Sequence, residues 1–569
     1  MNGLWYSIIS KKCAETFEME KSFAMENGFT MEVKMSKSYR PHYHASVPSG
    51  WCNDPNGTVF YNGKAHLFFQ HYPYKSEWGI MHWGHFTTND FVHWDLQPIA
   101  LVPDQKYEVG CGCCSGSAIE KDGALYLIYT AAQPDLQRQC LAKSTDGGIT
   151  FVKEETNPIL TAEMLDEEVS SFDFRDPHLF VKDGWYYFLA GARVIEKDAK
   201  SECGKDQEPV SSSSVQYAPC DCESISKDHV HHYSVSSKIQ TPSQSDVFGE
   251  TSAIPGFGNL ILCKSRDLMH WEYVGHLLHR QPEFEDDFYV LNGVYECPDY
   301  LVLDGQEVVL SSPQNLPQMD NLYQNVHSGL YMLGKLDFET GRYQVDKIGE
   351  LDNGFDFYAA QTMHMPDDRA ILIAWKEMWD RNYPTQAEGW AGTYSFPREL
   401  SIDGDMLIQK PVRELDAFCQ NRVACDSLSV TDGEISVPGV SGAVARIRVT
   451  LEPGTASKAG VKLFAGEKHE TVVYFDKEEG VLAIDRSKSG IPMTGKEENV
   501  NVRKLDIGQP ESIALECLLD VSSLEVFVAG GRHVMTANVY PDPEDIDVRF
   551  FAEGGSASFK NIEKFDVVV

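Results

Sequence analysis

Three acidic residues in the sequence share a local design that suits catalytic carboxylates. Asp54 in GWCNDPNG and Asp176 in SFDFRDPHLF directly precede a proline, and Glu296 in GVYECPDYL precedes one by two positions. Because proline disfavours the helical region for the residue before it, each acid lies on or beside stiff, extended backbone. A single acid of this kind is more often an Asx-turn residue of a loop, but paired carboxylates that flank a sugar are the usual apparatus of glycoside hydrolysis. We therefore consider the three acids together as candidate catalytic residues.

Polar and aromatic residues suited to sugar recognition occur around these acids. Side chains that stack on sugar rings or bind hydroxyl groups are typical of such sites, although tryptophan is equally often a core residue. The candidates of these types are Gln70, Trp78, Trp83 and Trp375. They are far apart in sequence, so the fold must bring them together.

Recurring strand-like runs predict the elements that position these residues. Aromatic and β-branched stretches such as HLFFQHY, ALYLIYTA and AILIAW alternate with turn residues, which indicates an all-β protein. The frame Asp-x-x-His-Trp occurs at 87–95 and 264–272, with a looser copy at 143–151. Asp90 and Asp146 are 56 residues apart and Asp146 and Asp267 are 121 apart, but removing the 62-residue polar tract at 196–257 leaves 59. Repeats of this length predict a five-bladed β-propeller at 37–411 with an insertion at about 196–257.

The two ends of the chain differ from this repeat. Alternating strands such as AVARIRVTL and SSLEVFVAG over 412–569 predict a C-terminal β-sandwich with a scaffold or accessory binding role. Residues 1–36 show little pattern, and we expect a poorly ordered N-terminal extension. Their lysines follow the apolar patch and no small-residue cleavage site ends it, so we expect a cytoplasmic protein.

Composition limits the possible partners. The 569 residues carry a formal net charge of -36, which disfavours nucleic acid and anionic membranes, and no stretch approaches a transmembrane run. The 14 cysteines are dispersed, so we expect free thiols, including the buried group Cys111, Cys113 and Cys114. We expect no cofactor and no metal, and we predict no particular oligomeric state. A metal role is disfavoured for a second group in the insertion, whose spacing fits no standard site: Cys203, Cys220, Cys222, His229, His231 and His232.

The motifs WCNDPNG, FRDP and YECPD, in this order, resemble the three signature motifs of glycoside hydrolase family 32, which contains invertases, sucrose-6-phosphate hydrolases and fructanases. Further matching stretches are HLFFQHYP, WGIMHWGHFTTNDFVHW, SGSA, DFYAAQT and SFPREL. The resemblance covers the chain from about Tyr39 through the sandwich, interrupted at 196–257. It implies a five-bladed propeller with a funnel-like active site, a sandwich behind it and a retaining mechanism.

The resemblance also implies roles for individual residues. Asp54 would be the nucleophile that attacks the anomeric carbon of the fructosyl unit. Glu296 would be the general acid that protonates the leaving oxygen and then activates water. Asp176, with Arg175 beside it, would hold fructose hydroxyls and stabilise the transition state. The rest of the fructose subsite would be lined by Asn53, Gln70, Trp78, Ser115 and Trp375.

The expected substrate is a small sugar, sucrose or sucrose 6-phosphate, cleaved at its terminal β-fructofuranosyl bond to give fructose and glucose or glucose 6-phosphate. An exo-fructanase or a fructosyltransferase would use the same acids and differ in the outer loops. A non-catalytic fructoside-binding propeller would be expected to have lost an acid, and all three are present. The sequence departs from the family pattern at Cys52 and Cys114, where bulkier apolar residues are common.

Overall fold

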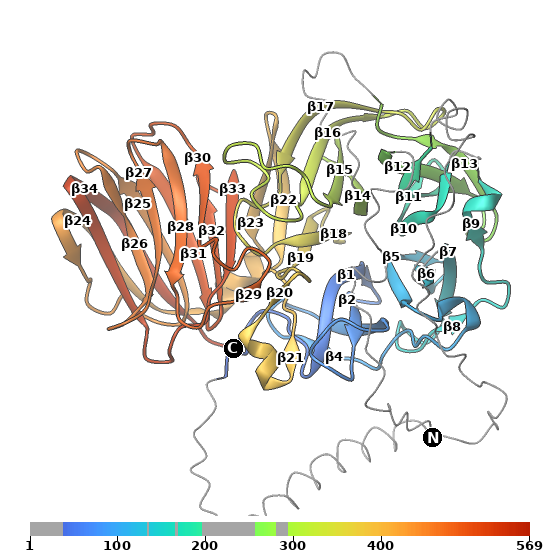
Figure 1. Ribbon diagram of the computed structural model, residues 1–569, viewed down its shortest axis with the longest axis horizontal. Helices are drawn as coiled ribbons and strands as arrows, with labels where there is room; N and C mark the ends of the chain where they lie inside the picture. The colour runs from blue at the N-terminus through green and yellow to red at the C-terminus, as the bar shows by residue number, and fades with distance from the viewer. Residues whose placement is uncertain (1–37, 134–135, 166–168, 196–256, 280–293) are drawn as a thin grey trace, which may run out of the picture. The chain divides into compact units, whose positions relative to one another are not determined.

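The computed structural model describes residues 38–133, 136–165, 169–195, 257–279 and 294–569. The predicted extension at 1–36 lies outside these residues, and so does the predicted insertion except for Phe257, which begins a strand. Tyr39–Val569 forms one compact unit, and its element labels follow Figure 1. No helix within the described ranges has both the length and the apolar character needed to cross a membrane.

Five antiparallel sheets form the first part of this unit. Blades one to three contain β1 (Gly50–Tyr61), β2 (Lys64–Tyr72), β3 (His82–Thr88) and β4 (Asp95–Leu96); β5 (Gly112–Lys121), β6 (Ala124–Gln133), β7 (Leu136–Ser144), β8 (Val152–Lys153) and β9 (Leu160–Thr161); and β10 (Val169–Lys182), β11 (Trp185–Val194), β12 (Phe257–Ser265) and β13 (Trp271–His276). Blades four and five contain β14 (Tyr295–Leu303), β15 (Gln306–Pro313), β16 (Leu330–Leu336) and β17 (Tyr343–Glu350); and β18 (Tyr358–His364), β19 (Ala370–Trp375), β22 (Arg398–Asp403) and β23 (Met406–Pro411). The 3-10 helices η1 (Lys106–Glu108), η2 (Ala162–Met164), η7 (Pro384–Glu388) and η8 (Arg413–Phe418) lie in connections.

The sheets form a closed ring, which confirms the predicted propeller. The first strands of the blades contact one another in sequence, β1 to β5, β5 to β10, β10 to β14, β14 to β18, and β18 back to β1. The short strand β21 (Trp390–Ala391), from the last blade region, pairs in parallel with β1 of the first blade. The Gly50 N–H also donates to the Gly389 carbonyl at 2.9 Å. Residues near both ends of the propeller therefore complete blade one.

Both faces of the central blade strands are buried, which explains their continuous apolar sequences. Successive residues of a strand point to opposite faces. In β6, Leu127 packs in the cluster shared with blade one, whereas the next residue, Ile128, packs in the cluster shared with blade three. In β11, Phe188 and Leu189 divide in the same way between the clusters on either side. The run ALYLIYTA thus fills two interfaces at once.

The repeated aspartate of the sequence closes the outer turn of the blades. Asp90 lies between β3 and β4, and its Oδ1 accepts from the Val92 and His93 N–H groups at 3.0 and 2.8 Å. Asp267 accepts from the equivalent N–H groups of the β12–β13 turn at 2.8 and 2.9 Å. Asp146 caps the β7–β8 turn one residue further along, where its Oδ1 accepts from the Ile149 and Thr150 N–H groups at 3.2 and 3.0 Å. The repeat is therefore a structural signal rather than a catalytic one.

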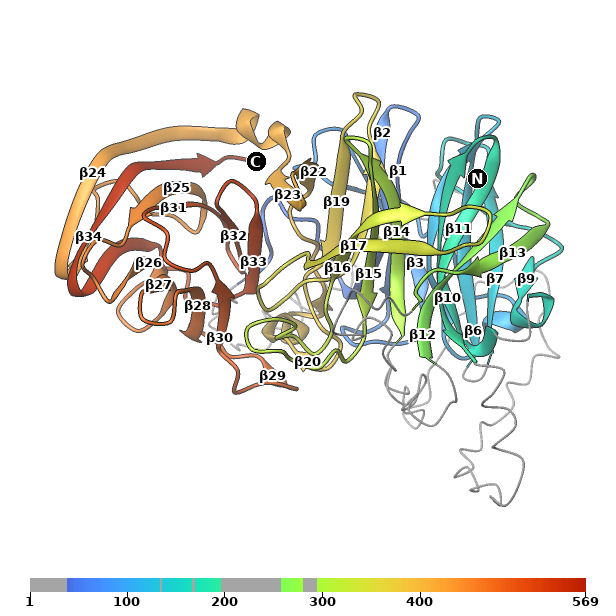
Figure 2. The same ribbon diagram turned by 90° about the horizontal axis from the view of Figure 1, so that it is seen from above.

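The C-terminal region is the predicted sandwich, built from ten hydrogen-bonded strands, nine of them in one continuous path and the tenth paired with the last strand of the chain. Its two longest strands run through both layers, and Figure 2 shows them curving together along one side. Positive φ values of 65° and 144° at Gly554 and Gly555 allow the bend, because these angles are strained for residues with a Cβ. The strands are β24 (Cys419–Ile435), β25 (Val444–Glu452), β26 (Lys458–Ala465), β27 (Glu470–Asp476), β28 (Val481–Lys488), β30 (Val502–Asp506), β31 (Ile513–Asp520), β32 (Ser523–Val528), β33 (His533–Asn538) and β34 (Asp547–Val567).

The sandwich is joined to the propeller by backbone pairing as well as side chains. β20 (Arg381–Asn382) of the propeller pairs with β29 (Thr494–Gly495) of the sandwich. The Gln409 N–H donates to the Gly531 carbonyl at 2.9 Å. The two regions therefore share an interface that includes backbone hydrogen bonds.

Candidate active site

The first strand of every blade is irregular at the same level of the ring. Register shifts of the β-bulge kind re-aim side chains and are common beside active sites. Asp176 and Cys297, which lie within two of these shifts, have φ values of 61° and 45°. The shifts fall between Cys52 and Pro55, Cys114 and Gly116, Arg175 and His178, Glu296 and Asp299, and Tyr358 and Gln361.

The three predicted acids converge around Cys297. Asp54, Asp176 and Glu296 are buried, with exposed fractions of 9%, 5% and 7%. Cys297 Sγ lies 3.6 Å from Asp54 Oδ2 and 3.8 Å from Asp176 Oδ2. The Cys297 backbone N–H donates to Asp176 Oδ2 at 3.1 Å, and Glu296 is its neighbour in sequence. Acids from blades one, three and four thus meet at the centre of the ring.

Asp54 is held by polar residues of blades one and two. The Ser115 hydroxyl donates to Asp54 Oδ2 at 2.6 Å, and Asn53 Nδ2 donates to Asp54 Oδ1 at 3.2 Å. Gln70 in turn donates to the Ser115 hydroxyl. Burial and repulsion from Glu296 raise the pKa of Asp54 to about 6, although the hydrogen bonds from Ser115 and Asn53 oppose this shift. The carboxylate is therefore ionised, and available as a nucleophile, above about pH 6.

Glu296 is held at both oxygens. Arg175 Nε donates to Glu296 Oε1 at 3.0 Å, and the Tyr358 hydroxyl donates to Oε2 at 2.7 Å. Arg175 Nη1 also donates to Asp173 Oδ1 at 2.8 Å, and Asp173 Oδ2 accepts from Arg193 Nε at 2.8 Å. The carboxylate is thus fixed in orientation from two different blades.

The pKa of Asp176 is shifted further than that of Asp54. Burial raises the pKa of Asp176 to about 8, repulsion from Glu296 and Asp54 adds to the shift, and Arg175 opposes it. The Asp176 N–H donates to Thr130 Oγ1 at 3.0 Å, which fixes the backbone at its positive φ. Asp176 therefore binds a proton near neutral pH.

The structure brings most of the predicted subsite residues to the acids. Asn53, Gln70, Ser115 and Arg175 contact an acid directly or through one side chain. Trp83, by contrast, is fully buried and donates its indole N–H to the Cys114 carbonyl at 3.1 Å, so it supports the strand that carries Ser115.

Trp78 and Trp375 occupy the apolar cluster beside the site. Both are buried in the cluster that contains Cys297 and Tyr358. Trp375 packs at 5.7 Å from Trp51 and stacks at 6.0 Å on Trp379, and its indole N–H has no partner in the described part of the chain. Their place in a sugar subsite stays a prediction.

Two residues that contact the acids, Tyr358 and Cys297, were not among the site residues predicted from the sequence. Tyr358 begins β18 in the matching stretch DFYAAQT, but its contact with Glu296 joins residues 62 positions apart. Cys297 is the residue between Glu296 and Pro298, and its thiol bridges the other two acids. The expected free thiols Cys111, Cys113 and Cys114 are buried and not in disulfides, and Cys113 Sγ donates to Glu108 Oε1 at 3.5 Å.

A group that could ligate a metal occurs away from the acids. Within the described ranges, His469, Asp542 and Asp545 of the sandwich place three ligand atoms within 4.8 Å of one another. The Asp542 N–H and the His469 ring already contact Asp545, at 2.8 and 2.7 Å. It lies in the sandwich, whereas the three acids lie in the propeller.

The five-bladed ring, the sandwich and the buried carboxyl cluster define a carbohydrate-cleaving propeller enzyme. The chain matches the glycosyl hydrolases family 32 N-terminal domain over residues 44–201 and 246–411, and the family 32 C-terminal domain over 415–566. It therefore belongs to glycoside hydrolase family 32.

Individual relatives span nearly the whole chain. A sucrose-6-phosphate hydrolase from Zymomonas mobilis is 30% identical over 547 residues, which cover 93% of each chain. The structure of a sucrose-6-phosphate hydrolase from Lactobacillus gasseri has a TM-score of 0.72 at 26% identity, with 94% of each chain covered. The structure of a Bombyx mori β-fructofuranosidase mutant in complex with sucrose has a TM-score of 0.67 at 28% identity, covering 93% of this chain and 94% of that one.

Proposed function

We propose that this family 32 hydrolase cleaves the terminal β-fructofuranosyl bond of sucrose or sucrose 6-phosphate with retention. In the first step Asp54 attacks the anomeric carbon of the fructosyl unit, and Glu296 gives its proton to the leaving oxygen, which departs as glucose or glucose 6-phosphate. In the second step Glu296 takes a proton from water, and the resulting hydroxide displaces Asp54 from the fructosyl ester. Fructose is released and both carboxyls return to their first state.

The convergence of the three acids on Cys297 carries this proposal. Asp54 has polar donors on both oxygens, as a nucleophile at a fixed position requires. Glu296 has one partner, the Tyr358 hydroxyl, that can accept as well as donate a hydrogen bond, and this suits a group that alternates between acid and base. Arg175 donates to Glu296, and Asp176 lies beside Cys297; we assign both to the binding of the fructose hydroxyls.

Two observations favour a disaccharide over a polymer as the substrate. The similar proteins reported above include two sucrose-6-phosphate hydrolases, and the Bombyx mori structure contains sucrose. An exo-fructanase or fructosyltransferase would use the same acids, so product analysis must separate these activities.

The test is a comparison of wild type and Asp54→Asn on sucrose, sucrose 6-phosphate, inulin and levan. We expect release of glucose or glucose 6-phosphate from the disaccharides, and a loss of about 10³-fold or more in the variant because the covalent path is removed. Ser144→Ala, in an outer turn of blade two, is the matched control and should keep full activity. Equal or faster cleavage of inulin or levan would make the enzyme a fructanase.

The stereochemistry of the product tests the retaining step directly. Proton NMR during the first minutes of hydrolysis should show β-fructofuranose before the other forms appear by mutarotation. Initial release of the α-anomer would mean that water attacks directly, and Asp54 would then be a base rather than a nucleophile.

A further inference from the structure

The segment that leads into β18 is bound to the sandwich. The Asn353 N–H donates to the Val534 carbonyl at 2.8 Å, and the Phe355 N–H donates to the Thr536 carbonyl at 2.7 Å. Both acceptors belong to β33, so residues 353–355 follow the edge of a sandwich strand. Three residues after Phe355, Tyr358 begins β18 and reaches Glu296.

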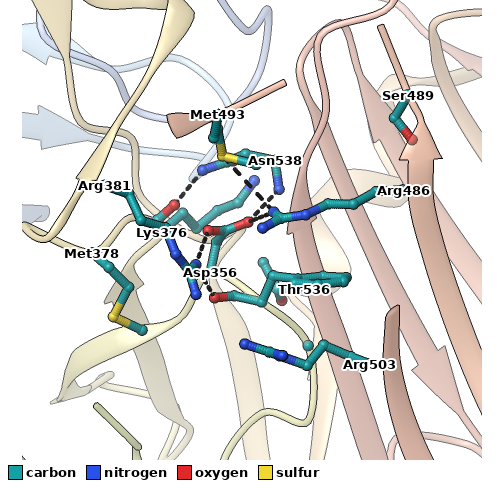
Figure 3. Close-up of polar contacts among 12 residues, drawn as sticks. Asp356, Lys376, Met378, Arg381, Arg486, Ser489, Met493, Arg503, Thr536 and Asn538 are labelled. Carbon is teal, nitrogen blue, oxygen red and sulfur yellow. Dashed lines mark hydrogen bonds and ion pairs between the residues drawn. The ribbon is translucent and has the colours of Figure 1, made fainter. Parts of the chain in front are cut away.

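Asp356 is the fixed point of this segment (Figure 3). Its side chain is fully buried, and its Oδ1 accepts from Arg381 Nη1 at 2.9 Å. Its Oδ2 accepts from Arg486 Nη1 at 2.9 Å and from the Asn538 N–H at 2.8 Å, both in the sandwich. The Arg486 guanidinium also lies 3.7 Å above the Phe355 ring. Two of the three donors to this carboxylate therefore come from the second domain.

The group of arginines around Asp356 is not arranged for stability alone. Burial and repulsion from Arg381 and Arg486 lower the pKa of Arg503 to about 10, although Glu497 opposes the shift. The Nε atoms of Arg381 and Arg486 are buried without a hydrogen-bond partner among the described residues. Buried ion pairs with unsatisfied donors are poor sources of stability compared with apolar packing. Such local conflicts are expected where a residue must be held in place for function.

Tyr358 can hydrogen-bond Glu296 whether Glu296 is ionised or protonated. Its hydroxyl lies 2.7 Å from Glu296 Oε2 and 2.8 Å from the Ser312 carbonyl, yet it has one hydrogen to donate. When Glu296 is ionised, that hydrogen bonds the carboxylate. When Glu296 is protonated, its own O–H can donate to the tyrosine oxygen while the tyrosine hydrogen turns to Ser312. Both arrangements need the ring to stay in one place.

We propose that the sandwich positions the general acid: Arg486 and Asn538 fix Asp356, and Asp356 fixes Tyr358 against Glu296. Tyr358 and Arg486 are positioning residues in this scheme, which rests on the proposed role of Glu296 as the acid. Several other titratable or charged groups face Glu296 or Tyr358 and must be considered when the pH dependence of the rate is interpreted. They are Arg175, Asp54, Asp176, Cys297 and His327, with Asp380 in contact with His327.

A double-mutant cycle with Tyr358→Phe and Arg486→Met tests the proposal. For sucrose, Tyr358→Phe should lower kcat by about tenfold or more with little change in KM. Its alkaline pH limit should rise by about one unit, because a donor to the ionised acid is lost. Arg486→Met should also lower kcat, by about three- to tenfold, with little change in KM and with a rise in the alkaline pH limit. In the Tyr358→Phe background it should add less than twofold, because its effect passes through Tyr358.

Further variants separate positioning from folding. Ser522→Ala removes another contact between sandwich and propeller, the 2.7 Å hydrogen bond to the Tyr39 carbonyl, and should leave kcat and the pH profile unchanged. Arg486→Lys, which keeps the charge, should recover part of the activity and serves if Arg486→Met fails to fold. A lower Tm in Arg486→Met with unchanged kcat and pH limit would overturn the proposal, and so would kcat losses that multiply in the double variant.

The role of Glu296 is checked separately with Glu296→Gln and 4-nitrophenyl β-fructofuranoside, whose leaving group needs no proton. Glu296→Gln should lose far more activity on sucrose than on this substrate, and Tyr358→Phe and Arg486→Met should show smaller losses of the same kind. If Glu296→Gln hydrolyses sucrose at the wild-type rate, the proposed function fails. If Glu296→Gln behaves as expected and Arg486→Met affects both substrates equally, only the positioning role fails.

Discussion

Replacing Asp54 with asparagine should stabilise the propeller at neutral pH while removing hydrolysis. Burial and repulsion from Glu296 raise the pKa of Asp54 from 3.8 to about 6. The ionised carboxylate is therefore less stable in the folded protein than in the unfolded chain. The shift corresponds to roughly 3 kcal/mol at about 1.36 kcal/mol per pKa unit.

Part of this gain is offset because asparagine cannot keep every hydrogen bond of Asp54. Asn53 Nδ2 donates to Asp54 Oδ1 at 3.2 Å, and in the variant this amide would face a second donor or lose its partner. That loss costs about 1 kcal/mol, which leaves a net gain of about 1 to 2 kcal/mol. For a domain of about 370 residues, the corresponding rise in Tm is about 2 °C.

The effect has a defined dependence on pH. Because the pKa of Asp54 is raised on folding, the folded state binds more protons than the unfolded state between about pH 4 and pH 6. The stability contributed by this carboxyl is fully present below about pH 3.8 and is lost as the pH rises through about 6. The Tm difference between Asp54→Asn and wild type should be small at pH 4.5 and complete by pH 7.5.

Differential scanning calorimetry across this pH range measures the difference, with Asp146→Asn as the control. Burial would raise the pKa of Asp146, but hydrogen bonds from Thr150, Ser144 and the turn backbone lower it to about 2. The same chemical change should therefore destabilise the protein at pH 7.5, the opposite sign. A folded Asp54→Asn protein with a Tm at or below wild type at pH 7.5, or a Tm difference that does not vary with pH, would refute the reasoning.

Three further outcomes are expected. Ser115→Ala removes the 2.6 Å hydrogen bond to Asp54, so the acid limb of kcat/KM on sucrose should move up by about one pH unit; an unmoved limb would mean that another group controls it. Iodoacetamide at pH 8 should leave Cys297 unmodified by mass spectrometry while partly exposed Cys425 reacts, because burial and the carboxylates around Cys297 raise its thiol pKa. Asp267→Asn should lower Tm by about 1 °C and leave kcat unchanged, because this aspartate closes an outer turn; a changed kcat would connect the turn to the site.

The fold could be predicted from the sequence because the repeat contains an aspartate that closes a local turn. The aspartates at positions 90, 146 and 267 mark one turn in each of three blades, and their spacing gives the blade length. The strand β21, two residues long, could not be predicted, because its pairing with β1 depends on the closed ring.

The candidate site is predictable where proline marks the backbone and unpredictable where packing decides. Asp54, Asp176 and Glu296 carry local signals, and the structure brings them together. Tyr358 reads as one more aromatic residue on a strand, and its contact with Glu296 exists only because blades four and five adjoin. Arg486 lies in an alternating sandwich strand, where an arginine is normally exposed. Its burial against Asp356 depends on how the two domains meet.

The closure of the ring has a consequence for the order in which the enzyme can mature on the ribosome. Asp54 is among the first described residues to be synthesised, yet β21, the parallel partner of β1, ends at Ala391. The segment just before β1 gains its partner even later, because the N–H groups of His42, Tyr43 and His44 all donate to Asp520. Blade one therefore keeps an open edge through most of translation, and Asp54 reaches its final surroundings only when nearly the whole chain has emerged.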